Sequence, residues 1–248
     1  MLKNKVAIVT GSSRGIGRAI ALKFASNGAS VTLVADQDKA GLDQVADEVR
    51  KIGMKAIIVP GDVARPELSK KAVQRTMDEF GTVDILVNCA VIITRPPVED
   101  LSLEDWFRVI DVNLHGTFHM CRAVLPLMRA KNKGKIINMS SQMAKLPHPS
   151  ASPSYEVSKA GQIALTRHLA YHYAKYNICV NAIAPGSINT QMPNSMSPEA
   201  REKIRQAIPF RRLGEPEEVS DLALFLASSM SDYITGATLD INGGSFMA

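Results

Sequence analysis

The chain has 248 residues, of which 46% are hydrophobic and 21% are charged, a balance typical of a soluble globular enzyme. Its longest apolar stretches are of strand length and are broken by polar residues, so we expect no membrane-spanning segment. The net charge of +5 suggests nucleic-acid binding, but the basic residues are scattered. The one local group, Lys131, Lys133 and Lys135, falls in an expected solvated turn, so we expect no nucleic-acid partner.

Short β-branched runs alternate with amphipathic helical segments, which predicts stacked βαβ units around a parallel sheet. The predicted strands are 6–9, 31–34, 56–59, 85–87, 135–139, 179–184 and 238–241. The predicted helices are 16–26, 39–52, 66–80, 103–129, 155–176 and 217–227, and Ser102 is the expected N-cap of the fourth. No linker-like composition interrupts the alternation. We therefore predict an α/β fold: a single Rossmann-type domain over residues 1–248, doubly wound, with a parallel sheet of about seven strands and helices on both faces.

A glycine-rich turn joins the first predicted strand to the helix that follows it. Glycine permits a tight turn and lets backbone N–H groups approach a pyrophosphate at the positive end of a helix. The Gly-x-x-x-Gly-x-Gly spacing is weak by itself, and a turn without a ligand is the alternative, but the strand before it and the helix after it favour a dinucleotide site. The residues expected to contact the cofactor here are Gly11, Ser13, Arg14, Gly15, Ile16 and Gly17.

Two aspartates follow the second and third predicted strands. A carboxylate at Asp36 would accept hydrogen bonds from ribose hydroxyls and repel a 2′-phosphate, and Asp62 is placed to meet an adenine amino group. The alternative is structural, because Asp36 could cap the helix 39–52 and Asp62 could cap the helix 66–80.

Tyr155 and Lys159 are four residues apart on a predicted helix, so their side chains share one face. An ammonium beside a phenol stabilises the phenolate and lowers the phenol pKa from about 10. A phenol tuned in this way beside a dinucleotide suits reversible hydride transfer to a carbonyl. The alternative is a core tyrosine with a lysine that extends to water.

Several short motifs occur together along the chain. In order they are Thr10 to Gly17, Asn88-Cys89-Ala90, Asn113, Ser141, Tyr155-x-x-x-Lys159 and Pro185-Gly186. Each motif is weak, but the ordered set is specific, and from about Lys5 to Gly244 the chain resembles the short-chain dehydrogenase/reductase family. The family's usual Asn-Asn-Ala-Gly ends here in Val91, a change near the adenine ribose that leaves the proton-transfer residues intact.

The resemblance implies a role for each of four catalytic residues. Tyr155 would exchange a proton with the substrate oxygen, and Lys159 would hold the nicotinamide ribose and lower the Tyr155 pKa. Ser141 would orient the substrate oxygen, and Asn113 would anchor a water that relays protons to Lys159. The resemblance also implies cofactor contacts at Val63, Asn88, Ala90, Pro185, Gly186, Ile188 and Thr190.

Two residues point to opposite cofactor preferences. In the resembling family, an arginine in the glycine-rich turn, here Arg14, often accompanies a 2′-phosphate. Asp36 would repel that phosphate, although it lies one place beyond the family's usual NAD aspartate, which is Ala35 here. Because poorly solvated like charges repel strongly, we expect NAD rather than NADP.

Four of the five histidines form two pairs with helical spacing, His115 with His119 and His168 with His172. This spacing can bind zinc, but no carboxylate or thiolate partner is evident, so we expect ordinary surface or interface histidines and no metal. The two helices are those that pair between subunits in the resembling family. The resemblance therefore implies a homotetramer, which histidine protonation would weaken at low pH.

The segment 187–213 is rich in Pro, Ser and Met, and its position after Pro185-Gly186 predicts a lid over cofactor and substrate, with a solvated surface excursion as the alternative. The expected substrate walls are 91–97, 143–152 and 189–212. Their flexible apolar side chains are Met143, Leu146, Met192 and Met196, and the side chains that could meet an anion are Arg95, Lys145 and His148.

Three functions are open at this point. The first is an NAD(P)-dependent dehydrogenase or reductase of small alcohols and ketones. The second is a 3-oxoacyl-[acyl-carrier-protein] reductase of fatty-acid synthesis, whose acidic carrier needs a basic patch; Arg129 is available, but Tyr171-His172 adds no strong positive charge. The third is a dinucleotide-binding sensor or scaffold without catalysis, against which the intact Ser141, Tyr155 and Lys159 argue.

The three cysteines, Cys89, Cys121 and Cys179, lack paired spacing, so we expect buried thiols in a reducing compartment. Met1 to Lys5 lead directly into the first predicted strand, so we expect no signal peptide and a cytoplasmic protein.

Overall fold

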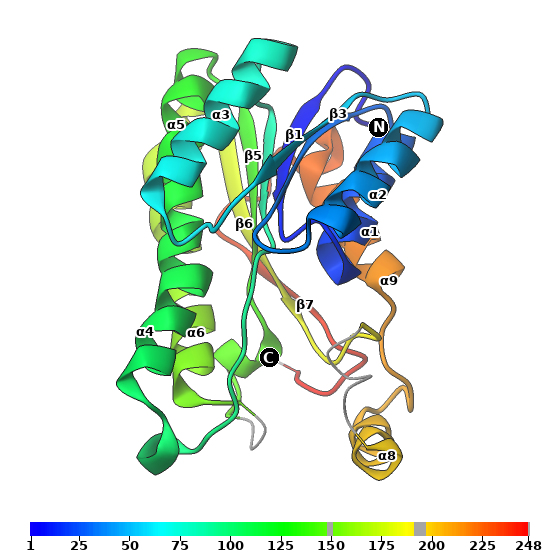
Figure 1. Cartoon of the computed structure of the whole chain (residues 1–248), viewed down its shortest axis with the longest axis vertical. Coiled ribbons are helices and arrows are strands. Elements are labelled where there is room, and N and C mark those ends of the chain that lie inside the picture. The colour runs from blue at the N-terminus through cyan, green and yellow to red at the C-terminus, as the bar shows by residue number, and fades with distance from the viewer. Residues whose placement is uncertain (148–150, 191–196, 248) are drawn as a thin grey trace.

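The computed structural model describes residues 1–147, 151–190 and 197–247, and within them seven strands form one sheet in the order β3-β2-β1-β4-β5-β6-β7 (Figure 1). The strands are β1 (Val6–Thr10), β2 (Ser30–Ala35), β3 (Ala56–Pro60), β4 (Ile85–Asn88), β5 (Gly134–Met139), β6 (Ile178–Pro185) and β7 (Thr238–Ile241). All of their pairings are parallel. The predicted Rossmann-type sheet is confirmed.

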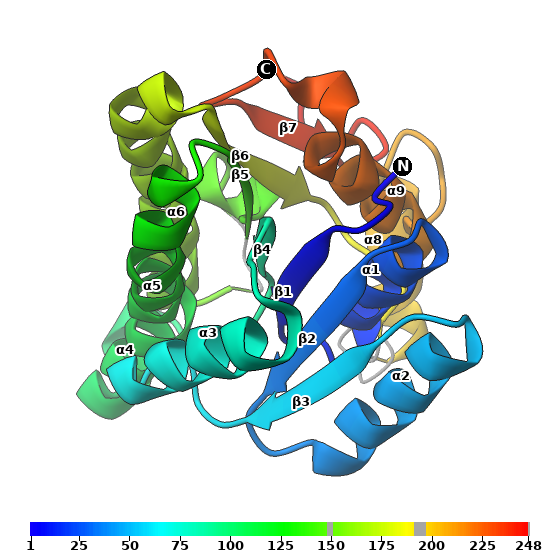
Figure 2. The same cartoon turned by 90° about the horizontal axis from the view of Figure 1, so that it is seen from above.

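Two helical layers cover the opposite faces of the sheet (Figure 2). One layer consists of α1 (Gly15–Ser26), α2 (Lys39–Lys51) and α9 (Pro216–Ala227). The other consists of α3 (Pro66–Phe80), α4 (Leu103–Ile110), α5 (Gly116–Ala130) and α6 (Pro153–Tyr173). A further helix, α8 (Pro198–Ala207), lies at the lower end of the molecule in Figure 1, outside both layers.

Alternate strand residues pack into two separate cores. In β1, Ala7 and Val9 belong to the core that also contains the buried face of α1, whereas Ile8 belongs to the core formed with α3 and α5. This follows from the two-residue period of a strand, and because both faces are covered, every residue of β1 is buried. Because all of the strands are parallel, their carboxyl ends meet at one edge of the sheet.

The predicted helix over 103–129 is interrupted, because a π turn at Asp111–His115 separates α4 from α5. The turn is held by the side chain of Asn113, whose Oδ1 accepts from the Ile92 amide at 2.9 Å and whose Nδ2 donates to the Ile92 carbonyl at 3.0 Å. Thr117 donates to the Asn113 carbonyl at 2.7 Å. These contacts with the segment after β4 favour a wider turn at this point, and π turns are often found at functional sites.

Helix α8 was not predicted, because it is short and polar and none of its residues is buried. Ser197 begins it, and the Ser197 hydroxyl accepts from the amide of Ala200.

The cysteines agree with their prediction, since all three are buried and free. Among the described residues, no helix is both long and apolar enough to cross a bilayer.

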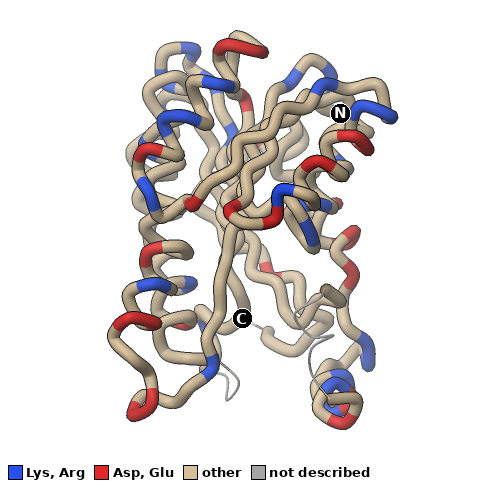
Figure 3. Tube along the Cα trace, in the orientation of Figure 1, with Lys and Arg blue, Asp and Glu red and all other residues tan. Residues whose placement is uncertain are grey.

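The interpretation of the basic group at 131–135 as a solvated turn is wrong for two of its three lysines. Lys135 is buried and its ammonium pairs with Asp232 at 2.8 Å, while Lys131 pairs with Asp84 at 2.6 Å. Both ammonium groups therefore have a structural role in joining loops at the amino ends of the strands. Elsewhere basic and acidic residues are interspersed along the chain (Figure 3).

Candidate active site

A cavity of about 1080 Å³ opens where the carboxyl ends of the strands meet. Strand β1 lies between β2 and β4, so the chain leaves β1 and β4 toward opposite faces and opens a crevice between their loops, the usual ligand position in an open α/β sheet. Of the residues predicted to be catalytic or to contact the cofactor, all line this cavity except Asn88 and Asn113.

The glycine-rich turn lies against the loop that follows β4. Gly11 and Gly15 have φ of +65° and +55°, and a Cβ on Gly11 would lie 2.8 Å from the Cα of Ala90. A Cβ on Gly17 would overlap the carbonyl of Gly11. The backbone therefore forms a tight concave surface that side chains would fill.

Helix α1 begins at this turn without a side-chain cap, since Arg14 at its N-cap makes no capping hydrogen bond. The first N–H groups of a helix have no partner within the helix, and they carry its positive dipole end. An uncapped helix start beside a glycine cradle fits a pyrophosphate.

The hydroxyl of Thr10 joins the glycine-rich turn to the β4 loop. Its Oγ1 accepts from the amides of Cys89 at 3.0 Å and Ala90 at 3.1 Å, and it donates to the Val87 carbonyl at 3.4 Å. These contacts hold the two loops that line the crevice at a set separation.

The alternative structural role of Asp36 and Asp62 is not observed, because Asp36 does not cap α2 and Asp62 does not cap α3. Asp38, not Asp36, caps α2 by accepting from the Gly41 amide at 2.9 Å, and the N-cap of α3 is Arg65. Asp62 accepts from the Ala64 amide at 2.9 Å and pairs with Arg108 at 2.6 Å. Arg108 also lies 3.9 Å from Asp36. Sequence reasoning missed Arg108 because it lies on α4, far along the chain from both aspartates.

Tyr155 and Lys159 lie in the first two turns of α6, which begins with Pro153 in its first turn. Lys159 is only 2% exposed, and its ammonium donates to the Met139 carbonyl at 2.6 Å and to Gln162 Oε1 at 3.0 Å. The Ser140 hydroxyl donates to the Lys159 carbonyl at 2.9 Å. The end of β5 thus anchors the helix that carries the pair.

The predicted lowering of the Tyr155 pKa is wrong for the protein alone. Burial raises the pKa of the Tyr155 phenol to about 12, and a hydrogen bond with Ser141 opposes this rise only in part. Burial also lowers the pKa of Lys159 to about 8. Both shifts favour the neutral form, as expected where charged groups are removed from water. The phenol therefore holds its proton at neutral pH.

The two predicted site residues outside the cavity are buried behind it. Asn88 donates to Asn138 Oδ1 at 2.9 Å and to the Cys121 sulfur at 3.3 Å. Its own Oδ1 is, among the described side chains, the one buried polar atom without a hydrogen-bond partner. The backbone carbonyl of Asn113, expected near a relay water, accepts instead from Gln162 Nε2 at 2.8 Å and from Thr117. Gln162 was missed because a lone glutamine on a helix carries no motif.

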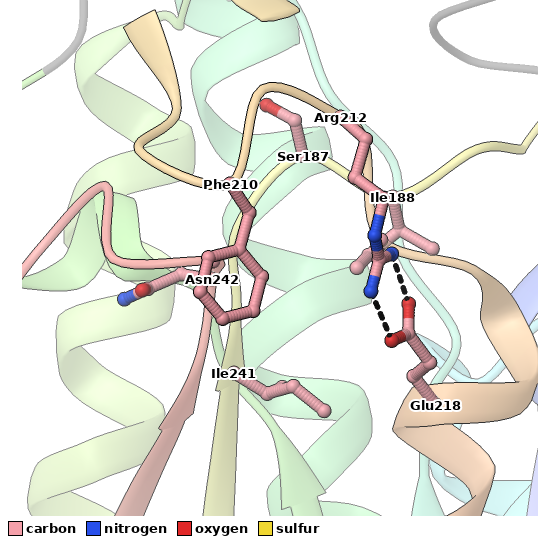
Figure 4. A pocket seen from close by; sticks show the side chains of 9 residues that line it. Ser187, Ile188, Phe210, Arg212, Glu218, Ile241 and Asn242 are labelled. Carbon is pink, nitrogen blue, oxygen red and sulfur yellow. Dashed lines mark hydrogen bonds and ion pairs between the residues drawn. The ribbon is translucent and has the colours of Figure 1, made fainter.

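Backbone hydrogen bonds join the two ends of the segment predicted to be a lid. The Asn189 amide donates to the Gly214 carbonyl at 2.7 Å, and the Gly214 amide donates to the Ser187 carbonyl at 3.0 Å. Arg212 and Glu218 form two parallel hydrogen bonds of 2.7 Å beside a small pocket of about 90 Å³ (Figure 4). The Arg212 guanidinium holds the pKa of Glu218 down to about 2.

Of the residues expected to meet an anion, Arg95 lines the main cavity and Lys145 does not. Lys145 pairs with Asp240 at 2.7 Å and does not line the main cavity. Arg95 and Met143 do line it. Arg201 on α8 also lines the cavity and was not singled out from the sequence, because no motif surrounds it. His148, Met192 and Met196 lie outside the described residues.

The histidine pairs lie on neighbouring helical surfaces. His115 Nδ1 is 2.8 Å from a carboxylate oxygen of Asp111, a partner not recognised in the sequence, and the rings of His168 and His172 are 4.4 Å apart. Within the described ranges, no group of three or more His, Cys, Asp or Glu side chains could hold a metal ion.

Comparison with known proteins identifies close relatives over nearly the whole chain. A protein-family profile described as "Enoyl-(Acyl carrier protein) reductase" matches residues 11–245. The chain is 36% identical over 244 residues to the 3-oxoacyl-[acyl-carrier-protein] reductase of Staphylococcus epidermidis, covering 98% of this chain and 100% of that protein. It is 40% identical over 247 residues to glucose 1-dehydrogenase 2 of Bacillus subtilis, covering 98% of this chain and 95% of that protein.

A solved structure agrees with these relatives. The crystal structure of a 3-oxoacyl-[acyl-carrier protein] reductase with bound NAD from Brucella melitensis superposes with a TM-score of 0.91 at 36% identity, over 99% of this chain and 92% of that chain. The names of these relatives point to different substrates, so the likeness does not select one.

Proposed function

The chain belongs to the short-chain dehydrogenase/reductase family of oxidoreductases, and from this premise we propose that it transfers a hydride between a nicotinamide dinucleotide and a secondary alcohol or ketone. The observation that carries the proposal is that Ser141, Tyr155 and Lys159 line one cavity together with the glycine-rich turn. The bound cofactor supplies or accepts the hydride. The residues of the chain orient the substrate and move the proton.

Tyr155 is the proposed general acid and base. Its hydroxyl gives a proton to the carbonyl oxygen in reduction and takes one from the alcohol in oxidation. Because burial raises its pKa to about 12, the phenol carries the proton that reduction requires. Once the proton has been transferred, the positive charge of Lys159 offsets part of the free-energy cost of the buried Tyr155 phenolate. Ser141 Oγ accepts from the Met143 amide at 3.1 Å, which positions the hydroxyl that hydrogen-bonds Tyr155 and would donate to the substrate oxygen.

The cofactor is proposed to lie along the crevice. The glycine-rich turn and the start of α1 would hold the pyrophosphate, Asp36 the ribose, and Asp62 with Val63 the adenine. The loop 185–190 would hold the nicotinamide end. We propose NAD as the preferred form, supported by the carboxylate of Asp36 and by a relative whose crystal structure contains NAD.

The test is a panel of ketones and secondary alcohols assayed with NADH, NADPH and their oxidised forms. We expect turnover of at least one carbonyl–alcohol pair, with NADH preferred. Binding of NADH without turnover of any member would instead support the third hypothesis, a dinucleotide-binding sensor or scaffold. The position of Ser141, Tyr155 and Lys159 in one cavity argues against such a loss of catalysis.

A second candidate is a 3-oxoacyl-[acyl-carrier-protein] reductase, which is supported by the names of several relatives. An acidic carrier needs a basic patch, and the residues expected to form one supply little charge. The Arg129 guanidinium stacks over the Tyr176 ring at 5.1 Å, and Tyr171 and His172 near the end of α6 add no lysine or arginine. Excess acyl carrier protein should compete with turnover if this candidate is correct, and should leave it unchanged if the substrate is a free small molecule.

We also propose that the chain forms one domain with a lid over 187–213 and assembles as a homotetramer. Support for assembly comes from apolar side chains exposed on the outer helices, with Phe118 of α5 45% exposed and Tyr171 of α6 83% exposed. Light scattering after gel filtration tests the assembly. An unchanged tetramer at about pH 5.5 would reject the additional idea that histidine protonation weakens it.

A further inference from the structure

The charged side chains that line the main cavity are unevenly distributed. Its carboxylates, Asp36, Asp38 and Asp62, all follow β2 or β3. The segment after β4 and helix α8 contribute Arg95 and Arg201, and the described residues of these two stretches add no Asp or Glu to the lining. These stretches lie on opposite sides of the lower half of the molecule in Figure 1.

Both arginines belong to the end of the cavity where the catalytic tyrosine lies. Thr94, the neighbour of Arg95, accepts from the Ser152 amide at 3.0 Å and so lies beside the start of α6, which carries Tyr155. Arg201 donates to Asn189 Oδ1 at 2.9 Å, and Asn189 belongs to the loop proposed to hold the nicotinamide end.

The positive charge of Arg201 is not neutralised by any described carboxylate. Its partner Asn189 is neutral, and the amide of Asn189 is held by Glu215 at 3.1 and 3.2 Å. Other arginines nearby are neutralised, since Arg205 pairs with Glu202 and Arg212 pairs with Glu218. Arg95 likewise has no ion pair among the described residues. Two unneutralised guanidinium groups at one end of a cavity with apolar walls favour an anionic ligand.

We propose that the substrate is an oxo acid or hydroxy acid whose carboxylate is bound by Arg201, with Arg95 on the opposite side, while its carbonyl or alcohol carbon faces Tyr155. The inference rests on the proposed function and names its substrate class. A planar guanidinium binds a carboxylate through two parallel hydrogen bonds, which would also fix the distance from the anion to the reacting carbon.

The test compares oxo acids of three to eight carbons, with the oxo group at each position, each paired with its own methyl ester. A phosphorylated ketone and 3-oxobutanoyl-pantetheine 4′-phosphate complete the panel. For the best acid we expect kcat/KM at least about tenfold above that of its ester, the effect of one charge-assisted contact. Arg201→Met should reduce this ratio to near one by lowering the value for the acid, and Arg95→Met should reduce it in part. Arg205→Met, on the same helix but paired with Glu202 and outside the cavity lining, should leave the ratio unchanged.

The possible outcomes separate this inference from the proposed function. Turnover of esters or neutral ketones at the same rate as acids, or a ratio unchanged in Arg201→Met, would overturn the inference and leave the proposed function standing. A phosphorylated ketone or the pantetheine phosphate as the better substrate would assign the arginines to phosphate and overturn the carboxylate. Absence of turnover on the whole panel would refute the proposed function and this inference with it.

Gln162 lies three residues after Lys159 on α6 and is fully buried. Its Oε1 accepts from the Lys159 ammonium at 3.0 Å. Its Nε2 donates to the Asn113 carbonyl at 2.8 Å and to Thr117 Oγ1 at 2.8 Å. The same carbonyl also accepts from Thr117, so both of its lone pairs are used.

We infer that Gln162 is a positioning residue that orients the Lys159 ammonium and takes the place of a relay water between Lys159 and Asn113. The amide links the two groups directly, but its N–H protons are not passed on as those of a water are. The titratable groups facing Lys159 are Tyr155 on its own helix and Cys89 after β4, while its contact from β5, the Met139 carbonyl, does not titrate.

Lysine Cε NMR of the full protein tests this, with the Lys159 signal assigned by its loss in Lys159→Met. In Gln162→Leu the ammonium loses an acceptor, so its titration midpoint should fall by about one pH unit, and kcat should fall about tenfold. In Gln162→Glu a carboxylate lies beside the ammonium, so the midpoint should rise. The exposed Gln74→Leu on α3 should leave both quantities unchanged.

Opposite shifts in two variants of similar volume distinguish positioning from a general loss of packing. Shifts of the same sign in both variants would overturn the inference, as would midpoints equal to that of the wild type in folded protein. A kcat unchanged in Gln162→Leu would also overturn it.

Discussion

The Lys159 ammonium nitrogen lies 5.7 Å from the centre of the Tyr155 ring, one turn further along α6. Its hydrogen bonds go to Met139 and Gln162 rather than to the phenol oxygen. The ammonium therefore faces the Tyr155 ring and is not placed for direct proton exchange with the hydroxyl. This geometry agrees with a phenol that stays protonated until a reacting oxygen arrives.

Tyr155→Phe removes the hydroxyl and keeps the ring. We expect kcat to fall about a thousandfold, the usual effect of losing a general acid, while NADH affinity stays nearly the same. Steady-state kinetics and NADH fluorescence titration measure the two quantities. Tyr233→Phe, at a fully exposed position outside the cavity lining, should behave as wild type. Retained turnover in Tyr155→Phe would mean that another group donates the proton.

The burial of Lys159 makes the stability of the protein depend on pH. Its pKa falls from 10.5 to about 8 on folding, so between these values the unfolded chain binds a proton that the folded chain does not. The contribution of Lys159 to the free energy of unfolding should therefore rise with pH across this window, by about 3 kcal/mol in total. Lys159→Met lacks this titration.

Urea unfolding of both proteins at equal concentration, from about pH 7.5 to about pH 9.5, measures this effect. The wild type should gain stability relative to Lys159→Met as the pH rises. A difference that stays constant over this range would show that the folded and unfolded pKa values of Lys159 are the same.

Asp36 is expected to select NAD over NADP. Asp36→Asn removes the negative charge that opposes a 2′-phosphate, while Arg108 and Arg14 remain in the cavity lining. We expect the ratio of kcat/KM for NADH to that for NADPH to fall about tenfold. Asp47→Asn, an exposed change on α2 outside the cavity, should leave the ratio unchanged. If Asp36→Asn also leaves it unchanged, the discrimination comes from another residue.

Gly17→Ala should disrupt the dinucleotide turn. The new Cβ would overlap the Gly11 carbonyl, so the backbone must shift, and we expect a loss of about 2 kcal/mol in stability together with a clear loss of NADH affinity. Gly53→Ala is a useful control, because its Cβ would meet no atom within 4 Å although φ is +91°. It should lower stability by about 1 kcal/mol and leave NADH affinity unchanged. Normal NADH binding by Gly17→Ala would contradict the proposed pyrophosphate site.

Much of the fold could be predicted from the sequence, because parallel strands buried on both faces produce continuous apolar runs. The helix Pro66–Phe80 and the strand Thr238–Ile241 have the predicted bounds, and the other strands differ by one residue at either end. The π turn at Asp111–His115 could not be predicted in this way. It depends on contacts between Asn113 and Ile92, and helical periodicity contains no information about such contacts.

The site was predictable where short motifs describe it and unpredictable where burial decides the chemistry. Ser141, Tyr155 and Lys159 do line one cavity, as their order in the chain indicated. The direction of the Tyr155 pKa shift was wrong, because the cost of removing a phenolate from water exceeds the effect of the opposing hydrogen bond with Ser141. Gln162, Arg108 and Arg201 were missed because each acts through a partner brought close only by folding.

The single hydroxyl of Thr10, which accepts from two amides of the β4 loop, has a consequence for how this scaffold can diversify. It ties the turn proposed to hold the cofactor to the first residues of the loop proposed to border the substrate, so neither loop can shift without the other. We therefore expect substrate choice to vary further along the same loop, from about Ile93 onward, after β5 near Met143, and on α8. Changes at these positions would leave the separation of the two tied loops unaltered.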